Sequence, residues 1–304
     1  MRSWPAILAA ATVGLQVGAA TVASRAVVHE VGPASLAMLR YAIGACCLLP
    51  FFFAAPRVRF SRRDLAAVAA LGIGQFGIII ILLNFGLLYL TSARAALLFA
   101  TFPLMTMLLA AALRRERMTV AKTLGVAVSF AGVGLALLDK LAAGNAAEGE
   151  WAGIVAVLGA VLTGAVCSVL YRPYLEKYPT LPVSTLAMVA SVFFLAMLAL
   201  PEGAADTIPQ LGPGAWGAIV FIGMSSGTAF FCWLWALGRL PPTQVTVFLS
   251  LSPVTAALLG ALLLDETLSM LTLAGLAAVV AGLLIAFVGP SPVAAVETPS
   301  EPPV

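Results

Sequence analysis

The chain is a succession of long apolar segments, each separated from the next by a short polar turn. A helix that crosses the roughly 30 Å hydrocarbon core of a bilayer needs about 20 mostly apolar residues. Apolar residues make up 62% of the chain and charged residues 10%, which is far outside the soluble range. We therefore predict an all-α polytopic membrane protein, whose ten transmembrane helices occupy residues 4–24, 33–54, 65–89, 93–113, 119–138, 151–172, 182–200, 214–237, 242–264 and 270–288.

The segments are predicted to be helices, because the strands of a membrane barrel alternate apolar and polar residues and these runs do not. The first segment is as long as a span, and no small-residue cleavage pattern follows it. We therefore expect it to remain in the mature protein. Residues 289–304 are rich in Pro and Glu and bury too little apolar surface to fold, which predicts a disordered tail.

Lys and Arg are distributed unequally between the two sides of this arrangement. If the N-terminus is cytoplasmic, twelve of these residues lie on the inner side, whereas only Arg25, Arg94 and Lys140 lie outside and Arg40 lies within a span. The positive-inside rule then places both termini in the cytoplasm, with the protein in a bacterial-type inner (plasma) membrane. The net charge of +3 reflects this asymmetry and does not indicate a nucleic-acid partner.

The second half of the chain repeats the first at an offset of 150 residues. The offset aligns Gly14 with Gly164, Gly77 with Gly227, Pro103 with Pro253, Glu116 with Glu266, and Gly132 with Gly282. Each half contains five predicted spans, and an odd number requires the two halves to lie in opposite orientations in the bilayer. We therefore predict two inverted five-helix repeats at residues 1–138 and 151–288, a linker at 139–150 and a tail at 289–304.

A further pattern occurs once in each half: a start rich in small residues, then Pro, Glu, a short polar pair and Gly. It reads SARAALLFATFPLMTMLLAAALRRERMTVAKTLGVAVSFAG in the first half and TQVTVFLSLSPVTAALLGALLLDETLSMLTLAGLAAVVAG in the second. With the Leu39–Arg40 pair, the pattern resembles the EamA domain of the drug/metabolite transporter superfamily, present in two copies. The resemblance implies a ten-helix transporter of small metabolites that works by alternating access. Within that superfamily the chain is similar to the YddG-like proteins, which export amino acids, including aromatic ones.

Inverted repeats place a substrate site near the bilayer midplane, between the halves. Polar side chains at that depth usually face the bundle interior. The candidate substrate-binding residues are Gln16, Gln75, Thr101, Thr163, Ser225 and Ser250, with Thr228 and Ser252 at similar depth and Phe76 and Phe99 nearby. For each Ser or Thr, the simpler interpretation is a hydrogen bond to its own or a neighbouring helix. The two glutamines are harder to satisfy locally and costlier to bury.

Arg40 is the only charged residue deep within a predicted span, about seven residues from its start. A charge at this position is expensive and indicates a functional site. Two roles remain open. Its long stem can snorkel towards the outer interface or brace the helix packing, or its guanidinium can bind a substrate, for which a carboxylate is the natural partner.

Pro103 and Pro253 are predicted to lie near the middle of matched helices, where each removes a backbone hydrogen bond and bends the helix. The bend is either a static packing feature or a hinge for the transport motion, and matched breaks in both halves favour the hinge. The Gly14–Gly18 and Gly223–Gly227 pairs are expected to be close-packing surfaces. Glu116 and Glu266 lie at span ends, where we expect each to cap or brace the next helix start.

Several kinds of chemistry have no support in the sequence. It contains neither a metal-binding spacing of His or Cys nor a phosphate-binding Gly-Lys loop, so no cofactor, metal or direct use of ATP is predicted. No pair of carboxylates or activated nucleophile lies within the spans, which argues against an enzyme. Intramembrane proton relays usually use Asp, Glu or His. We therefore expect a substrate to move down its own gradient or by exchange.

The function predicted from the sequence is a secondary carrier of small molecules in the lipid bilayer, most consistent with export of amino acids, and no oligomer is required. Two alternatives remain. One is efflux of drugs or other metabolites, although cationic drugs would favour an intramembrane carboxylate that the sequence lacks. The other is a non-transporting membrane protein on the same scaffold.

Overall fold

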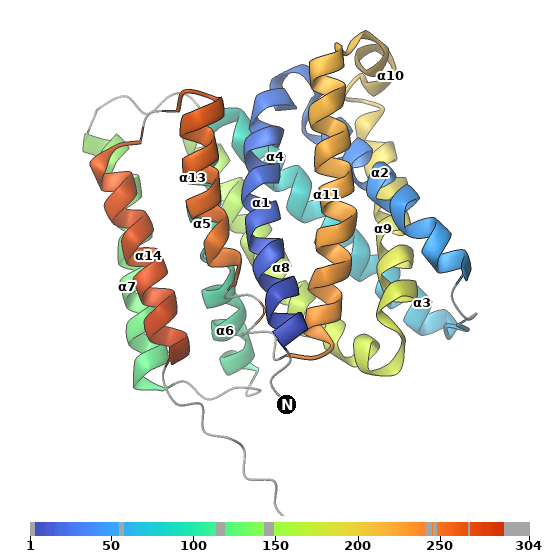
Figure 1. Ribbon diagram of the computed structural model, residues 1–304, viewed down its shortest axis with the longest axis horizontal. Coiled ribbons are helices and arrows are strands. Elements are labelled where there is room, and N and C mark those ends of the chain that lie inside the picture. Colours follow the sequence, from blue (N-terminus) through green and yellow to red (C-terminus); the bar gives the residue numbers. More distant parts are fainter. Residues whose placement is uncertain are drawn as a thin grey trace, which may run out of the picture.

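The computed structural model describes residues 4–54, 58–113, 119–142, 149–240, 245, 248–266 and 268–288, and all regular structure in these ranges is helical (Figure 1). Within them, seven helical runs are long and apolar enough to cross a membrane. They are α1 (Trp4–Val31), α2 (Pro33–Ala54), the run Arg62–Tyr89, the run Ser92–Ala112, α8 (Glu150–Lys177), α9 (Thr180–Ala199) and α11 (Pro213–Leu237).

Three further helices are apolar, and each occupies one of the remaining predicted spans: α7 (Val120–Ala142), α13 (Leu251–Leu263) and α14 (Met270–Val288). The polytopic, all-helical class predicted from the sequence is thereby confirmed. Residues 143–148 of the predicted linker and the whole tail at 289–304 lie outside the described residues, as does Glu116. The short α10 (Ala204–Thr207) and the 3-10 turn η2 (Ile208–Gln210) join α9 to α11.

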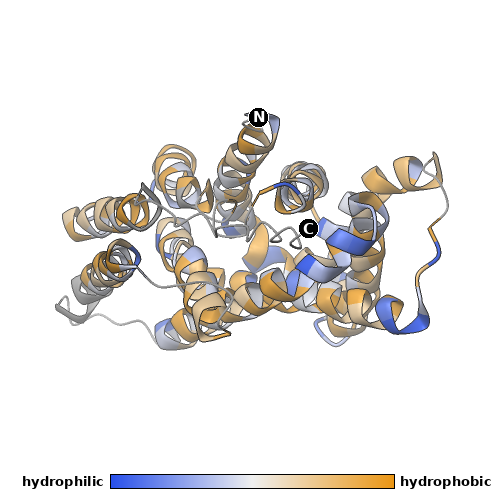
Figure 2. Ribbon diagram, turned by 90° about the horizontal axis from the view of Figure 1, so that it is seen from below, coloured by the Kyte–Doolittle hydropathy of each residue, from blue (hydrophilic) through white to orange (hydrophobic). Residues whose placement is uncertain are grey.

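Large apolar side chains cover the outside of the bundle. Phe53, Phe193, Met197 and Leu262 are among the exposed large residues, although they lie on helices that also contribute to the core. Viewed along the bundle, apolar residues predominate on the helices (Figure 2). An apolar exterior of this extent is unfavourable in water and is matched by lipid, so the protein is a multi-pass membrane protein.

Two of the long runs are not continuous α-helices. The run Arg62–Tyr89 consists of α3 (Arg62–Gly72), a π-helical turn η1 (Ile73–Ile78) and α4 (Ile79–Tyr89). The run Ser92–Ala112 consists of α5 (Ser92–Phe99) and α6 (Phe102–Ala112), with Ala100 and Thr101 between them. At this break the backbone N–H of Thr101 donates to the carbonyl of Leu98 at 3.1 Å, a tighter turn than that of an α-helix.

The matched prolines lie directly after breaks. Pro103 is in the first turn of α6, and Pro253 is in the first turn of α13, which follows the 3-10 turn η3 (Phe248–Ser250). The sequence predicted prolines in the middle of bent helices, whereas the structure divides the first span into two helices and precedes α13 with a tighter turn. The physical reason is that proline fits a first helical turn, where the backbone N–H has no intrahelical partner.

The main helix pairs are kept when each helix is replaced by its counterpart 150 residues away. Helix α1 packs on α11 and α13, whereas its counterpart α8 packs on α4 and α6. Helix α2 packs on its own counterpart α9, and α7 lies along α14 as a separate pair at one side of the bundle (Figure 1). Elements of the two halves are therefore interleaved in one bundle.

Glycines bring these interleaved helices close together. A Cβ on Gly14 would overlap the carbonyl oxygen of Phe248, and one on Gly18 would lie 2.5 Å from the carbonyl oxygen of Ser252. In the other half, a Cβ on Gly164 would overlap the ring of Phe102. Gly223 and Gly227 face α2 at similarly short distances. The predicted close-packing role of both glycine pairs is confirmed.

We predict that Gly14→Ala destabilises the fold, because its methyl group must displace backbone rather than a flexible side chain. Overpacking of this kind costs about 1–3 kcal/mol or more, which thermal unfolding in detergent, followed by size-exclusion chromatography, would register as a lower apparent Tm. The matched control is Gly217→Ala on α11, where nothing lies within 4 Å of the added Cβ. Equal apparent Tm values for the two variants would contradict the close approach.

Candidate functional site

A cavity lies inside the bundle where α1, α2, the π-helical turn, the α5–α6 break and α11 meet. Its volume of about 100 Å³ exceeds the roughly 10–15 Å³ that one water requires. Four polar side chains line it: Thr21, Arg40, Gln75 and Ser226. The rest of the lining is aliphatic or aromatic, and the aromatic residues are Tyr41, Phe76, Phe99, Phe102, Phe230 and Trp233.

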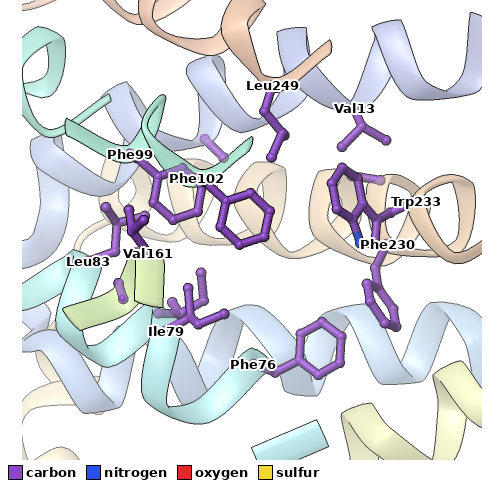
Figure 3. Packing of buried hydrophobic residues seen from close by; sticks show 14 of the residues in the cluster. Val13, Phe76, Ile79, Leu83, Phe99, Phe102, Val161, Phe230, Trp233 and Leu249 are labelled. Atoms are coloured by element: carbon purple, nitrogen blue, oxygen red, sulfur yellow. The ribbon is translucent and has the colours of Figure 1, made fainter. Parts of the chain in front are cut away.

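Two groups of packed aromatic rings border this space (Figure 3). The ring centroids of Phe76 and Phe230 are 4.0 Å apart in an edge-to-face arrangement, and Tyr41 packs edge-on against Phe76 at 5.0 Å. Phe102 stacks on Phe99 at 5.6 Å and approaches Trp233 at 6.2 Å. Edge-to-face and offset contacts of this kind are the favoured geometries for aromatic pairs. The wall is therefore a packed surface with defined ring faces.

Arg40 on α2 brings a positive charge to this cavity and is only 8% exposed. Its Nε donates to Ser226 Oγ on α11 at 2.5 Å, and that hydroxyl donates to the carbonyl of Ile222 at 2.5 Å. The guanidinium carbon lies 5.5 Å from the centre of the Tyr41 ring. Within the described part of the chain, no carboxylate pairs with Arg40 and its terminal nitrogens have no hydrogen-bond partner. The cavity thus contains a fixed cation that lacks a counter-ion there.

Gln75 enters the cavity from the π-helical turn. An i→i+5 turn inserts one residue into the helical register, and such turns are frequent at functional sites. The turn contains Gln75 and Phe76, and Ile79 and Ile80 follow it in the cavity wall. Gln75 Oε1 is shielded from solvent and has no hydrogen-bond partner in the described structure. Because burying an unpaired acceptor costs about 1–3 kcal/mol, this oxygen is available to a ligand.

Of the nine residues predicted to bind substrate, the structure brings Arg40, Gln75, Phe76 and Phe99 together in the cavity wall. The hydroxyls of Thr101 and Thr163 instead donate to the carbonyls of Leu98 and Gly159 in their own helices. The remaining three do not contribute to the described wall: Gln16 is half-buried on α1, Ser225 lies beside Ser226 on α11, and the side chain of Ser250 is outside the described residues.

Thr21 and Ser226 are the two polar residues of the cavity wall that the sequence analysis missed. Ser226 was overlooked in favour of Ser225 because depth in the span does not distinguish neighbours. A signal was present, however. Ser226 is three residues after Gly223 and one before Gly227, so it shares the face on which those glycines approach α2. That face also carries Phe230 and Trp233 at further helical spacings, and both line the cavity.

Two carboxylates of the second half bind helix starts of the first half at one end of the bundle. Glu202 accepts from the backbone N–H groups of Ala34 and Ser35 at 3.1 and 2.6 Å and from the Ser35 hydroxyl at 2.7 Å. Gly32, with a φ of 87°, leaves room for this side chain at the start of α2. A carboxylate is favourable there because the first turn of a helix presents unpaired N–H groups.

Glu266 makes the corresponding contact at the start of α5. It accepts from the Ser92 backbone N–H at 2.9 Å and from the Ser92 hydroxyl at 2.5 Å. The sequence predicted that Glu266 would brace the next helix, α14. The start of α5 is its partner instead, because α13 packs on α5 and Gly260 lets the Glu266 carboxylate and the Ser92 hydroxyl approach.

The opposite end of the bundle is held by Asp64 at the start of α3. Its carboxylate accepts from Lys177 Nζ at 2.5 Å and from the Tyr178 hydroxyl at 2.6 Å. The Tyr178 ring packs on Phe60, with centroids 4.5 Å apart. Both ends therefore have polar links between the halves. Among the residues that the structure describes, no cluster of His, Cys, Asp and Glu could hold a metal ion.

We predict that Ser92 and Glu266 are energetically coupled. In a double-mutant cycle of Ser92→Ala and Glu266→Ala, the loss of stability in the double variant should fall short of the sum of the single losses by about 1–3 kcal/mol. A hydrogen bond to a charged group is worth this much, and either substitution alone removes it. The measurement is unfolding in detergent. The control cycle pairs Ser92→Ala with Glu202→Ala, which share no contact and should be additive. Additivity in the first cycle would show that the link contributes nothing.

Comparison with known proteins places the chain among transporters. Residues 4–138 and 151–288 both match the EamA-like transporter family. The chain is 29% identical over 288 residues to an uncharacterized transporter of Archaeoglobus fulgidus, covering 94% of this chain and 98% of that protein. It is 31% identical to a probable terminal-alkyne amino-acid exporter of Streptantibioticus cattleyicolor, covering 84% of each.

Two further comparisons agree with these. A probable amino-acid metabolite efflux pump of Salmonella typhimurium is 27% identical, over 84% of this chain and 86% of that protein. A protein crystal structure superposes with a TM-score of 0.70 at 22% identity, covering 95% of this chain and 98% of the other. This structural likeness shows that the fold is a known one.

Proposed function

The chain belongs to the EamA-like transporter family, and from this premise we propose that it is a secondary carrier that moves amino-acid-like metabolites across a membrane by alternating access. The observation that carries the proposal is the buried Arg40 guanidinium. It lies in an aromatic cavity, and no carboxylate of the described residues pairs with it. A substrate carboxylate would supply the missing counter-ion and two oxygens matched to the guanidinium fork.

Alternating access is supported by the interleaved packing. The helices that contact α1 are the counterparts, 150 residues away, of the helices that contact α8. This is expected for two inverted repeats related by a pseudo-two-fold axis in the membrane plane. We propose ten transmembrane helices in two such repeats, at residues 1–138 and 151–288. A scaffold of this kind has two related arrangements, each of which opens the same central site to a different side.

The breaks before Pro103 and Pro253 are proposed as the hinges of this motion. Both lie where a short helix or tight turn meets a longer helix, and both are packed against the first helix of the other half through Gly164 and Gly14. A broken span can change its angle without the loss of a continuous run of hydrogen bonds.

Amino acids are the proposed substrate class for two reasons. The printed names of two relatives refer to amino-acid export or amino-acid metabolite efflux. In addition, the cavity combines one cation with apolar and aromatic walls, which suit a carboxylate joined to an apolar side chain. Efflux of cationic drugs is less well supported, because no Asp or Glu lines the described cavity.

The distribution of Lys and Arg supports an inner-membrane protein with both termini in the cytoplasm. In that orientation, the end held by Glu202 and Glu266 faces outward and the end held by Asp64 faces the cytoplasm. Net export is the proposed direction.

We predict saturable counterflow of labelled phenylalanine, threonine or methionine in proteoliposomes that contain the purified protein. Arg40→Ala should reduce it by at least tenfold, because a charge-assisted hydrogen bond is worth about 1.5–3 kcal/mol, and Arg40→Lys should retain part of the activity. The control is Arg239→Ala, whose guanidinium lies outside the cavity over the Trp235 ring. Absence of counterflow for all three amino acids, from folded protein, would rule out the proposed substrate class.

We further predict that this counterflow proceeds without an imposed pH gradient. The described cavity wall contains no Asp, Glu or His that could carry a proton with the substrate. Initial rates at equal internal and external pH should therefore match those measured with a gradient of one pH unit. Strict dependence on the gradient would show that a proton is coupled to transport.

A further inference from the structure

We propose that Gln75 recognises the ammonium group of the substrate, so that Arg40 and Gln75 together select a zwitterion over a simple carboxylate. This inference rests on the proposed function, because it assumes that amino acids occupy the cavity. It names a binding partner for the positive charge of the substrate, because the described cavity wall contains no carboxylate that could pair with it.

A neutral acceptor is the described group best suited to this task. An ammonium group can only donate hydrogen bonds. The other polar groups in the cavity wall are less suited. The Ser226 hydroxyl already accepts from Arg40 and donates to Ile222, and the Thr21 hydroxyl is held to its own helix because it donates to the Val17 carbonyl. The Tyr41 ring lies against the Arg40 guanidinium, whose charge would repel an ammonium. Gln75 Oε1 is an acceptor without a described partner. A substrate ammonium would satisfy it and relieve the cost of its burial.

The aromatic wall complements this acceptor. Phe76 follows Gln75 in the π-helical turn, and its ring packs edge-on against Phe230, with Trp233 on the same wall (Figure 3). The faces of such rings carry partial negative charge and attract cations, most strongly in a desolvated site. An ammonium at Gln75 would therefore lie beside ring faces that hold it without a formal counter-charge.

The two polar groups are connected through the same rings. The Arg40 guanidinium lies against Tyr41, Tyr41 packs on Phe76, and Phe76 adjoins Gln75 in sequence. Because only one carbon separates the two charged groups of an α-amino acid, their binding groups must border one small space. Arg40 and Gln75 both line this single cavity. The apolar part of the cavity wall, which includes Phe99 and Leu249, would contact the substrate side chain.

The test compares two ligands that differ only in the amino group. Phenylalanine and 3-phenylpropionate compete for counterflow of labelled phenylalanine, in wild type and in Gln75→Leu. Wild type should prefer phenylalanine by about 10- to 100-fold, the range of one hydrogen bond to a charged group. Gln75→Leu should lower this ratio towards one by weakening phenylalanine alone. Equal weakening of both ligands would overturn the inference and make Gln75 a residue that only shapes the cavity.

Further variants make the outcome specific. Gln75→Glu retains an acceptor and should preserve or raise the preference for phenylalanine. Gln75→Ala also removes the acceptor and replaces Gln75→Leu if the leucine variant does not fold. Ser168→Ala is the control. Like Gln75→Leu, it removes a buried polar atom that has no described partner, but Ser168 lies outside the cavity wall, so the ratio should not change. Arg40→Gln should weaken both ligands, because both have a carboxylate.

The inference and the proposed function fail in different ways. If folded wild-type protein gives no phenylalanine counterflow, the proposed function is wrong and the inference falls with it. If wild type carries phenylalanine but does not discriminate against 3-phenylpropionate, only the inference is wrong. Thermal unfolding of each variant separates loss of binding from loss of fold.

Discussion

The breaks in the two proline-containing segments are the feature on which the rest of the structure depends. A backbone that leaves the α-helical pattern inside a bilayer must be shielded from lipid and have its polar groups satisfied by protein. The α5–α6 break is covered by α8, where Gly164 admits the Phe102 ring, and the turn before α13 is covered by α1, where Gly14 admits the backbone at Phe248. Each half therefore covers the broken segment of the other.

This exchange also positions the cavity. Phe99 and Phe102 flank the first break, and Leu249 lies in the turn before α13, so both broken segments contribute to the cavity wall. Arg40 reaches the same space from α2 because Gly223 and Gly227 let α11 approach closely enough for Ser226 to orient its guanidinium. A motion at either break would thus change the cavity that contains the charge.

The parts of this arrangement that follow from composition and periodicity were predictable. Apolar length predicted the polytopic helical class, and the cost of a charge within a span singled out Arg40, which lies in the cavity wall. Ser226 was missed because a hydroxyl is cheap at any depth and only its neighbouring glycines indicate its direction. The π-helical turn at Gln75 was missed because an inserted residue leaves the apolar length of a span unchanged. Thr101 and Thr163 were candidates by depth alone, and the hydroxyl of each donates a hydrogen bond to a backbone carbonyl of its own helical segment.

The described links at the two ends of the bundle join different groups. At one end, Glu202 and Glu266 accept five hydrogen bonds from the starts of α2 and α5, where Ser35 and Ser92 are buried. At the other, the Lys177 side chain is 58% exposed, and an exposed ion pair contributes about 0–1 kcal/mol because water and salt screen it. The Glu202 side chain is itself exposed and Glu266 is half-buried, so water and salt also screen the charges at the Glu202 end in part. At the Asp64 end, the buried Tyr178 adds a hydrogen bond to the carboxylate at 2.6 Å. Each end therefore joins a partly screened charge to a buried partner, so the two halves are held together by the same kind of contact at both ends.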